Sequence, residues 1–418
     1  MTATTSAPSR TSAASGRTRT LRTTMRSAWN DPAMPYYLIS VLVLVTVALG
    51  LVFVLSSSAV KSLSRGNAPY DEFFGQAQFA LIGLPLAFAV SRLPVDFLKK
   101  FAWVAYFGAL GLQLTPFFLE PVTANGNIVG VILGPITFQP GEFAKVGLVL
   151  WLGAVLANKQ HQLGKIRHLL VPVLGSALMI AAQLKTEDMG TSLVLVAIVA
   201  GSLFVAGVPL RIFAGLGVAA LGVIAFLSTL GQTRLARIMA VFQPGEVDSQ
   251  GVGWQLKQSL WALGTGGVSG VGLGGSRTKW LHLPEAHNDF ILAVIGEELG
   301  LLGILLVLIL FGLLMVGLTR IVTLHPNPFV KIATGAISAW VLFQAVVNIG
   351  MVIGVLPVIG IPLPLISTGG SSLIATLIAF GIVLAFARDL PGAKARINGR
   401  RGATRRSFAL LARGRRAV

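Results

Sequence analysis

The sequence predicts an all-α integral membrane protein, and three observations support this fold class. Of its 418 residues, 54% are hydrophobic and only 11% are charged, and the mean hydropathy is +0.79. Several apolar runs approach or exceed the roughly 18–20 residues that a helix needs to cross the hydrocarbon core of a bilayer. These runs are too long and continuous for the strands of a membrane barrel. The composition therefore excludes an ordinary soluble protein and a disordered chain.

Ten membrane-spanning helices are expected. The seventh run is separated from the sixth only by a tight turn near Pro209. The expected spans are 36–56, 74–91, 101–119, 140–157, 168–185, 190–209, 211–230, 290–318, 330–355 and 372–388. The first run is expected to be an uncleaved anchor, since no short apolar core with a small-residue cleavage site precedes it.

The distribution of charge predicts the orientation of these spans. With the amino terminus inside, the inside segments hold 24 of the 33 Lys and Arg residues and three of the 15 acids. Their net charge is then +21, against −3 for the rest of the chain. This positive-inside pattern places both termini in the cytoplasm.

The chain is expected to form one membrane domain, 36–388, between two basic cytoplasmic tails, 1–35 and 389–418. The net charge of +18 is concentrated in the tails and inside loops, which favours anionic lipid over nucleic acid as its partner. Disordered tails that only keep the protein soluble are an equally good interpretation. The chain has no cysteine, which excludes disulfides and cysteine-based metal or catalytic sites.

Two non-cytoplasmic stretches are longer than simple connections. One is 120–139, and the other is the 58-residue loop 231–288 between the seventh and eighth spans. Within this loop, 253–264 (GWQLKQSLWALG) predicts a short helix with leucines on one face and tryptophans suited to the membrane interface. We expect this helix to lie along the outer membrane surface.

A third irregular stretch is 354–372, GVLPVIGIPLPLISTGGSS. Pro357, Pro362 and Pro364 exclude a regular helix there. Backbone outside a helix at membrane depth must be buried in protein or line a water-filled space. Such a broken segment is typical of a binding site.

Five acidic or histidine side chains lie close together in 283–301 (LPEAHNDFILAVIGEELGL). Glu285, His287 and Asp289 precede an apolar run, and Glu297 and Glu298 lie inside it. A charge at the centre of a membrane helix costs about 2.5–3.5 kcal/mol on insertion scales, so these residues are expected to have a role.

If 285–301 is a helix, Asp289 and Glu297 are about 12 Å apart along its axis. The two carboxylates of a glycosidase are only about 5–9.5 Å apart, so these two acids would not act as such a pair. Glu285 lies one turn from Asp289 and fits that spacing better. Glu298 points to the opposite side and is expected to pair with another helix.

Other polar motifs have structural explanations beside functional ones. Glu142 and Lys145 are three residues apart on one helix face and are expected to form an intramembrane ion pair, although intramembrane charges are functional by default. Of Glu187 and Asp188, capping of the next helix explains at least one.

A G-x-G-x-x-G pattern occurs at Gly270, Gly272 and Gly275, but no strand precedes it, so a tightly turned or flexible lid is favoured over a dinucleotide site. His282, Glu285, His287 and Asp289 match no zinc spacing. Their oxygen ligands would suit Mg²⁺ or Mn²⁺ shared with a substrate phosphate.

Taken together, these motifs resemble the SEDS family (shape, elongation, division and sporulation) over about 36–388. The matching pieces occur in the family's order. They are Asn125-Gly126, QPGEFAK at 139–145, EDMGT at 187–191, RLARI at 234–238, LPEAHNDF at 283–290, IGEELG at 295–300, VNIG at 347–350 and GIPLPLISTGGSS at 360–372. The sequence PEAH followed by IGEELG favours the division branch of the family over its elongation branch.

The resemblance implies a peptidoglycan glycosyltransferase of septal cell-wall synthesis. Such an enzyme polymerises lipid II into glycan strands on the outer face of the cytoplasmic membrane and releases undecaprenyl diphosphate. It works with a class B penicillin-binding protein, the transpeptidase, and with other division proteins. The family's essential aspartate matches Asp289.

The chemistry of glycosyl transfer assigns expected roles to the candidate residues. A sugar hydroxyl needs a base to accept its proton, and we expect Asp289 to be this base. A leaving diphosphate needs cations, which side chains or a divalent ion (Mg²⁺ or Mn²⁺), bound at Asp289 through the substrate, would supply. Expected substrate-binding residues are Glu285, His287, Arg234, Arg237, Lys257, Lys279, Ser367, Gly369 and Ser371. Expected structural ion-pairing residues are Glu142, Lys145, Glu297 and Glu298.

Two departures from the family pattern are present. Asn127, Ile128, Val129 and Gly130 stand where Ala-Arg-Arg-Trp is usual after Asn-Gly, so no role of that Arg-Trp pair can be assigned. Asn288 replaces the usual Thr before the aspartate.

Two other functions fit a ten-helix protein with intramembrane charges. One is a lipid II flippase or other transporter, and the other is a non-catalytic scaffold for the partner synthase. Transporter sites usually lie near the bilayer midplane, whereas this cluster lies at the outer mouth, which favours chemistry on the outer face.

Overall fold

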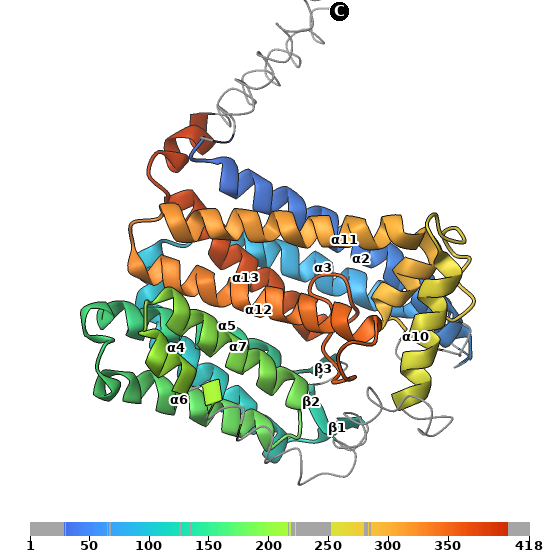
Figure 1. Cartoon of the computed structure of the whole chain (residues 1–418), viewed down its shortest axis with the longest axis horizontal. Helices are drawn as coiled ribbons and strands as arrows, with labels where there is room; N and C mark the ends of the chain where they lie inside the picture. The colour runs from blue at the N-terminus through green and yellow to red at the C-terminus, as the bar shows by residue number, and fades with distance from the viewer. Residues whose placement is uncertain are drawn as a thin grey trace, which may run out of the picture.

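The computed structural model describes residues 29, 31–64, 66, 68–124, 127–133, 136–215, 217–218, 222, 252–279, 283 and 286–399. Long helices make up most of this part of the chain, and three short strands form one small sheet (Figure 1). The α-helices are α2 (Met34–Ser64), α3 (Asp71–Val90), α4 (Val95–Leu114), α5 (Pro140–Asn158), α6 (Ile166–Leu184), α7 (Met189–Val205), α10 (Val252–Gly266), α11 (Ile291–Leu324), α12 (Pro328–Val352) and α13 (Gly370–Asp389). The strands are β1 (Pro121–Ala124), β2 (Asn127–Leu133) and β3 (Ile136–Phe138), and short 3₁₀ turns are Thr115–Phe117 and Gln160–Gln162.

Within the described residues, seven helices are long and apolar enough to cross a membrane: α2, α3, α5, α6, α11, α12 and α13. They lie where seven of the ten spans were expected, which confirms the helical membrane fold. Of the other three expected spans, 101–119 overlaps α4, and 190–209 corresponds to α7, a shorter apolar helix. Most of 211–230 lies outside the described residues. The number of ten spans and the cytoplasmic position of both termini stay predictions.

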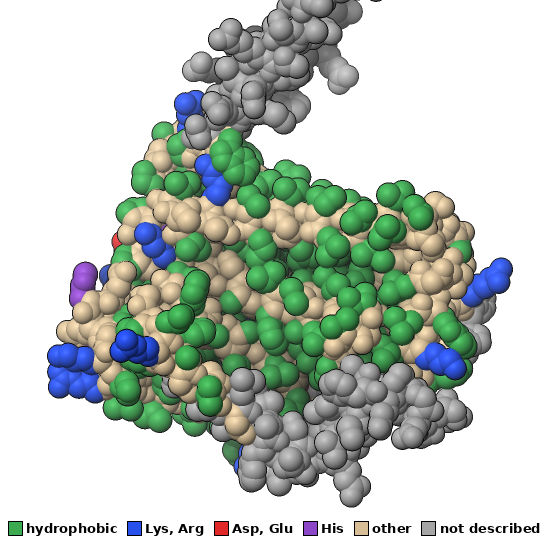
Figure 2. Space-filling model, in the orientation of Figure 1, with side chains coloured by type: hydrophobic (Ala, Val, Ile, Leu, Met, Phe, Trp, Pro, Cys, Tyr) green, Lys and Arg blue, Asp and Glu red, His purple; other side chains and the backbone are tan. Residues whose placement is uncertain are grey.

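The helices differ in how much of their surface is covered by protein. In the most apolar windows, 78% of α5, 67% of α12 and 72% of α13 is buried, against 22% of α3 and 28% of α6. The first three therefore form the interior of the bundle, where α12 packs on α5 and α7, and α13 packs on α3 (Figure 1). The apolar side chains on the outside, such as Leu81 and Leu174, suit contact with lipid. Figure 2 shows apolar side chains over the middle of the face in view, with Lys and Arg mainly toward its edges.

Helix α11 is broken at Gly300, whose φ of 66° and ψ of −159° are not helical. The backbone groups released by the break are paired with the loop that follows α10. Gly267 O and Val268 O accept hydrogen bonds from the N–H groups of Leu301 and Leu302, and Glu297 O and Glu298 O accept from Val271 N and Gly272 N. The glycine-rich pattern at 270–275 therefore belongs to a tight turn docked on α11, in agreement with the tightly turned segment expected from the sequence.

Helix α10 confirms the short helix expected at 253–264. Leu256 is buried, and Ser259 Oγ donates a hydrogen bond to Val352 O at the end of α12. Leu260 and Trp261 are exposed. The helix lies across the end of α11 in Figure 1. Its position on the outer membrane surface stays a prediction.

The sheet formed by β1, β2 and β3 is a feature that the sequence analysis missed. The three strands pair in order and antiparallel, with Ala124 opposite Asn127. Asn-Gly between two short runs rich in β-branched residues is a strong hairpin signal, and it was available at 125–126. Ile128 N donates to Thr186 O, which joins the sheet to the turn between α6 and α7. The residues that replace the family's Ala-Arg-Arg-Trp are thus the first half of β2.

We predict that Gly270→Ala destabilises the protein more than Gly272→Ala does. Both glycines have positive φ (78° and 96°), which costs an L-residue about 1–2 kcal/mol. A Cβ on Gly270 would also clash with the carbonyl of Glu298, whereas a Cβ on Gly272 would meet open space. Overpacking adds about 1–3 kcal/mol, so the apparent melting temperature in detergent should fall further for Gly270→Ala. Equal losses would show that the turn is not docked on α11.

Candidate functional site

The segment that carries Asp289 is a turn rather than part of a helix. Residues 286–290 form turns, and α11 begins at Ile291 with Phe290 as its N-cap. The start of α11 agrees with the span expected from residue 290, and the axial spacing calculated for Asp289 and Glu297 on one helix does not apply because Asp289 precedes the helix. Glu285, the expected neighbour of Asp289, lies outside the described residues.

Three consecutive carbonyl groups in this turn are held by hydrogen bonds from later parts of the chain. Thr368 donates to His287 O from both its backbone N (3.1 Å) and its Oγ1 (3.0 Å). Ser367 Oγ donates to Asn288 O at 2.6 Å, and Asn348 Nδ2 donates to Asp289 O at 2.8 Å. The backbone before α11 is thus fixed by the end of α12 and by the segment between α12 and α13.

That segment, 353–369, has no regular helix, as its three prolines predicted. It is tied to α3 through Gln76, whose Nε2 donates to Ser367 O (3.3 Å) and whose Oε1 accepts from Gly369 N (3.1 Å). Ser367 Oγ also accepts a hydrogen bond from Leu363 N at 2.9 Å. The buried Gln76 side chain therefore supports the segment that holds the turn at 287–289.

The side chain of Asp289 faces the middle of the irregular segment. A Cβ placed on Gly360 would lie 3.7 Å from Asp289 Oδ2. A Cβ on Gly190, at the start of α7, would lie within 3.1 Å of the carbonyl oxygens of Ile359 and Gly360. Three motifs that are far apart in the sequence therefore meet around Asp289: 187–191, 283–290 and 360–372.

His287 contacts an acid that the sequence analysis did not single out. Its Nε2 lies 3.7 Å from Oε2 of Glu72, in the first turn of α3. The imidazole is largely buried, and the carboxylate is partly exposed. Glu72 and Gln76 are one turn apart on α3, so this helix supports both His287 and the segment 367–369.

A second polar group lies at the start of α5 and α7. The ammonium of Lys145 lies 2.7 Å from Glu142 Oε2, and it also lies 4.8 Å from the ring centre of Trp340. Asp188 caps α7 by accepting a hydrogen bond from Thr191 N, and its other oxygen accepts from Gln183 Nε2. The structure thus shows the Glu142–Lys145 pair and the capping by Asp188 that the sequence indicated.

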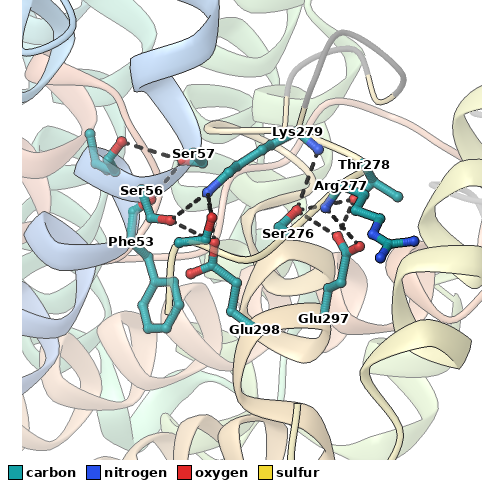
Figure 3. Close-up of polar contacts among 11 residues, drawn as sticks. Phe53, Ser56, Ser57, Ser276, Arg277, Thr278, Lys279, Glu297 and Glu298 are labelled. Atoms are coloured by element: carbon teal, nitrogen blue, oxygen red, sulfur yellow. Dashed lines mark hydrogen bonds and ion pairs between the residues drawn. The ribbon is translucent and has the colours of Figure 1, made fainter. Parts of the chain in front are cut away.

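The two acids inside α11 are completely buried and have different partners (Figure 3). Glu298 Oε1 accepts hydrogen bonds from Lys279 Nζ at 3.0 Å and from Ser56 Oγ at 2.6 Å. Lys279 Nζ also donates to Ser56 Oγ (3.2 Å) and Gly274 O (2.8 Å). Glu298 therefore joins α11 to α2 and to the loop 267–279.

Among the described residues, no lysine or arginine side chain pairs with Glu297. Its carboxylate instead accepts hydrogen bonds from the same loop, 267–279. Its Oε2 accepts hydrogen bonds from the hydroxyls of Ser276 (2.5 Å) and Thr278, and its Oε1 accepts from Arg277 N at 3.0 Å. Both glutamates thus fix the loop after α10 on the helix that follows Asp289.

These contacts change the interpretation of Lys279, which the sequence analysis expected to bind the diphosphate. An ammonium has three N–H donors, and Glu298, Ser56 and Gly274 accept one hydrogen bond each. Lys279 therefore has no free donor for a diphosphate in this arrangement, and its position is that of a structural cation.

The other expected substrate-binding residues are only partly brought together. Ser367 and Gly369 hold the backbone around Asp289, as described above, and Ser371 Oγ accepts a hydrogen bond from Gln139 N. Lys257 is exposed on α10, with its ammonium 4.9 Å from the ring centre of Trp261. Arg234 and Arg237 lie outside the described residues, as do Glu285 and His282.

Three residues with clear roles in this arrangement were missed: Glu72, Gln76 and Asn348. Gln76 and Asn348 are buried polar side chains inside apolar helices, which is itself a signal of function. Asn348 lies in the VNIG motif, for which the sequence analysis proposed no role.

The described residues contain no group of three or more His, Cys, Asp or Glu side chains that would hold a metal ion. Asp289 would therefore bind a divalent ion only together with oxygen atoms from elsewhere, such as a substrate diphosphate.

Comparison with known proteins gives one consistent result. The family profile of FtsW, RodA and SpoVE, described as "Cell cycle protein", matches residues 36–390. The probable peptidoglycan glycosyltransferase FtsW of Mycobacterium tuberculosis is 36% identical over 373 residues, which cover 88% of this chain and 71% of that protein. The FtsW of Halorhodospira halophila, also named a probable peptidoglycan glycosyltransferase, is 38% identical over 85% of this chain and 91% of its own length.

Solved structures show the same fold. A chain of a peptidoglycan synthase complex, described as coordinating polymerization and crosslinking, matches with a TM-score of 0.68 and 30% identity. The alignment covers 84% of this chain and 97% of that chain. The rod shape determining protein RodA of Thermus thermophilus matches with a TM-score of 0.62 and 28% identity, over 84% of this chain and 96% of its own.

We predict that Lys279→Met destabilises the fold strongly, because it leaves the Glu298 carboxylate buried without its cation. Breaking a buried ion pair on one side typically costs about 3–5 kcal/mol. Lys257→Met, which removes an exposed lysine from α10, is the matched control and should change the apparent melting temperature little.

Adding Glu298→Gln to Lys279→Met should recover part of the lost stability, since it removes the unpaired charge. A Lys279→Met protein as stable as the Lys257→Met protein would contradict the role of this ion pair.

Proposed function

This chain belongs to the FtsW/RodA/SpoVE family, and we propose that it is the glycosyltransferase of septal cell-wall synthesis. The protein is an integral membrane enzyme with peptidoglycan glycosyltransferase activity, and it polymerises lipid II into glycan strands. We propose that the strands form on the outer face of the cytoplasmic membrane, with undecaprenyl diphosphate as the released product.

The observation that carries the proposed mechanism is the fixed position of Asp289. Hydrogen bonds from Thr368, Ser367 and Asn348 hold three successive carbonyl groups at 287–289. A carboxylate on so constrained a backbone is preorganised to accept a proton, because little of its position has to change during the reaction.

In the proposed reaction, a sugar hydroxyl attacks the anomeric carbon of the donor sugar. The proton of the hydroxyl passes to the carboxylate of Asp289 as the new glycosidic bond forms. The bond between the anomeric carbon and the diphosphate breaks, and its electron pair leaves with the diphosphate.

Negative charge that develops on the leaving diphosphate must be stabilised. Since the three donors of Lys279 are engaged with Glu298, Ser56 and Gly274, we propose that Arg234, Arg237 and Lys257 carry this role, and that Asp289 would help to hold Mg²⁺ or Mn²⁺ together with the substrate. The ion would act as a Lewis acid that neutralises negative charge on the diphosphate oxygens.

We propose a class B penicillin-binding protein as the partner of this chain, at the division septum. The similarity to a chain of a peptidoglycan synthase complex supports a partner with crosslinking activity, and the similarity to FtsW proteins supports the division role. The basic tails are expected to face the cytoplasm and to contact anionic lipid.

The decisive experiment mixes the purified protein and its partner with fluorescent lipid II in detergent. A polymerase makes glycan ladders without a sealed membrane, whereas a flippase or a scaffold does not. We expect Asp289→Asn to reduce ladder formation by about 10²–10⁴-fold, the usual contribution of general base catalysis. Asp96→Asn, which changes an exposed acid at the start of α4, is the control and should keep wild-type activity. A folded Asp289→Asn protein with the wild-type rate would remove the aspartate from the mechanism.

We further expect a chelator such as EDTA to slow ladder formation, with recovery when Mg²⁺ or Mn²⁺ is added. The melting temperature should change little, since no cluster of ligands in the described part of the chain holds an ion without substrate. An unchanged rate in EDTA would assign the stabilisation of the diphosphate to side chains alone.

A further inference from the structure

Asn348 occupies a buried position in the last two turns of α12, at the level of the irregular segment that follows this helix. Its side chain is completely buried. A primary amide at such a site loses its hydrogen bonds to water, so burial is tolerated only where protein groups replace them. The partners of this amide therefore indicate its role.

Both hydrogen bonds donated by the amide go to carbonyl groups outside regular helix. Nδ2 donates to Asp289 O at 2.8 Å and to Ile361 O at 2.8 Å. No group among the described residues donates to Oδ1. An amide rotated by 180° would place Oδ1 against two carbonyl oxygens, so the donor orientation is fixed by its surroundings.

These two carbonyls belong to the two segments that define the environment of the Asp289 carboxylate. One is the backbone of Asp289 itself. The other follows Gly360 directly, and Gly360 lies beside Asp289 Oδ2. A single side chain thus joins the backbone of the residue that carries the carboxylate to the backbone that the carboxylate faces, beside the hydrogen bonds of Ser367 and Thr368 to the preceding carbonyls.

We propose that Asn348 is a positioning residue for Asp289, and that it acts on the rate of glycosyl transfer through the backbone of that aspartate. The proposal rests on the function proposed above. Catalytic groups must be held within about 0.5 Å of their productive geometry, and a misplacement of about 1 Å costs about 10²-fold in rate. Asn348 itself does not contact the reacting atoms.

The same helix contains a natural comparison. Gln344, one turn earlier, is also a buried amide, and its Oε1 accepts a hydrogen bond from Trp340 Nε1 at 2.6 Å. This hydrogen bond stays within α12, whereas those of Asn348 leave the helix. Loss of either amide removes buried hydrogen bonding from α12, but only the loss of Asn348 removes the hydrogen bond to the backbone of Asp289.

The test compares Asn348→Ala with Gln344→Ala in the lipid II assay, using full-length protein with its partner. For Asn348→Ala, we expect kcat to fall by about 10–100-fold while KM for lipid II stays within about twofold, since substrate-binding groups are unchanged. Gln344→Ala should keep kcat. Both proteins should fold, and their melting temperatures are measured alongside.

Asn348→Leu supplies a second variant in case truncation perturbs packing. It keeps a similar side-chain size but has no donor, so kcat should fall about as far as for Asn348→Ala. Asn348→Ser, which retains one donor, should recover part of the rate.

The outcomes separate this inference from the function proposed above. Inactive wild-type protein, or an Asp289→Asn protein with full activity, would contradict the proposed function or its base. With those two results as expected, an Asn348→Ala protein that keeps the wild-type kcat would overturn the positioning role. Equal losses of kcat and of melting temperature in Asn348→Ala and Gln344→Ala would also overturn it. A raised KM with unchanged kcat would also overturn it.

Discussion

Inside a bilayer every backbone N–H and C=O needs a partner within the protein, and this constraint governs the structure around Asp289. The helices satisfy it by themselves. Three stretches do not: the turn 286–290, the segment 353–369 and the break in α11 at Gly300. Besides local hydrogen bonds, each receives hydrogen bonds from a distant part of the chain: the turn pairs with residues of 353–369 and with α12, and the break at Gly300 pairs with the loop after α10.

The same constraint explains the two acids buried inside α11. The break at Gly300 leaves backbone groups that only an approaching loop can pair, and the loop 267–279 supplies them. Glu297 and Glu298 then hold this loop by their side chains, with Lys279 and hydroxyl groups as partners. A buried pair of this kind adds little net stability, but removing one partner is strongly unfavourable, so it makes one arrangement of the loop much better than others.

A rigid arrangement of irregular backbone is well suited to glycosyl transfer. The enzyme must hold a base beside a sugar hydroxyl and keep cations near a diphosphate, and neither task requires a covalent intermediate on the protein. Asp289, the proposed base, lies on a turn in which the three successive carbonyls of 287–289 accept hydrogen bonds, next to α3, α7 and α12. This accounts for the polar residues that the apolar helices contain at this level of the bundle, such as Gln76 and Asn348.

The sequence alone determined the elements that depend on local chemistry. Apolar length located the spanning helices, three prolines located the irregular segment, leucine spacing located α10, and the acid before Met189 located the cap of α7. The ordered motifs identified the family, and the catalytic role of Asp289 stays a prediction. The start of α11 was expected at residue 290 and lies at Ile291, whereas the hairpin was missed although its Asn-Gly signal at 125–126 was present.

Only the tertiary structure decided which distant residues meet. Asn348 and Asp289 are 59 positions apart, and Gln76 and Ser367 are 291 apart. Lys279 had the charge to bind a diphosphate, and the sequence held no sign that three acceptors surround it. The physical reason is that a hydrogen bond depends on distance and direction in space, whereas spacing along the chain specifies these only within one helix or one turn.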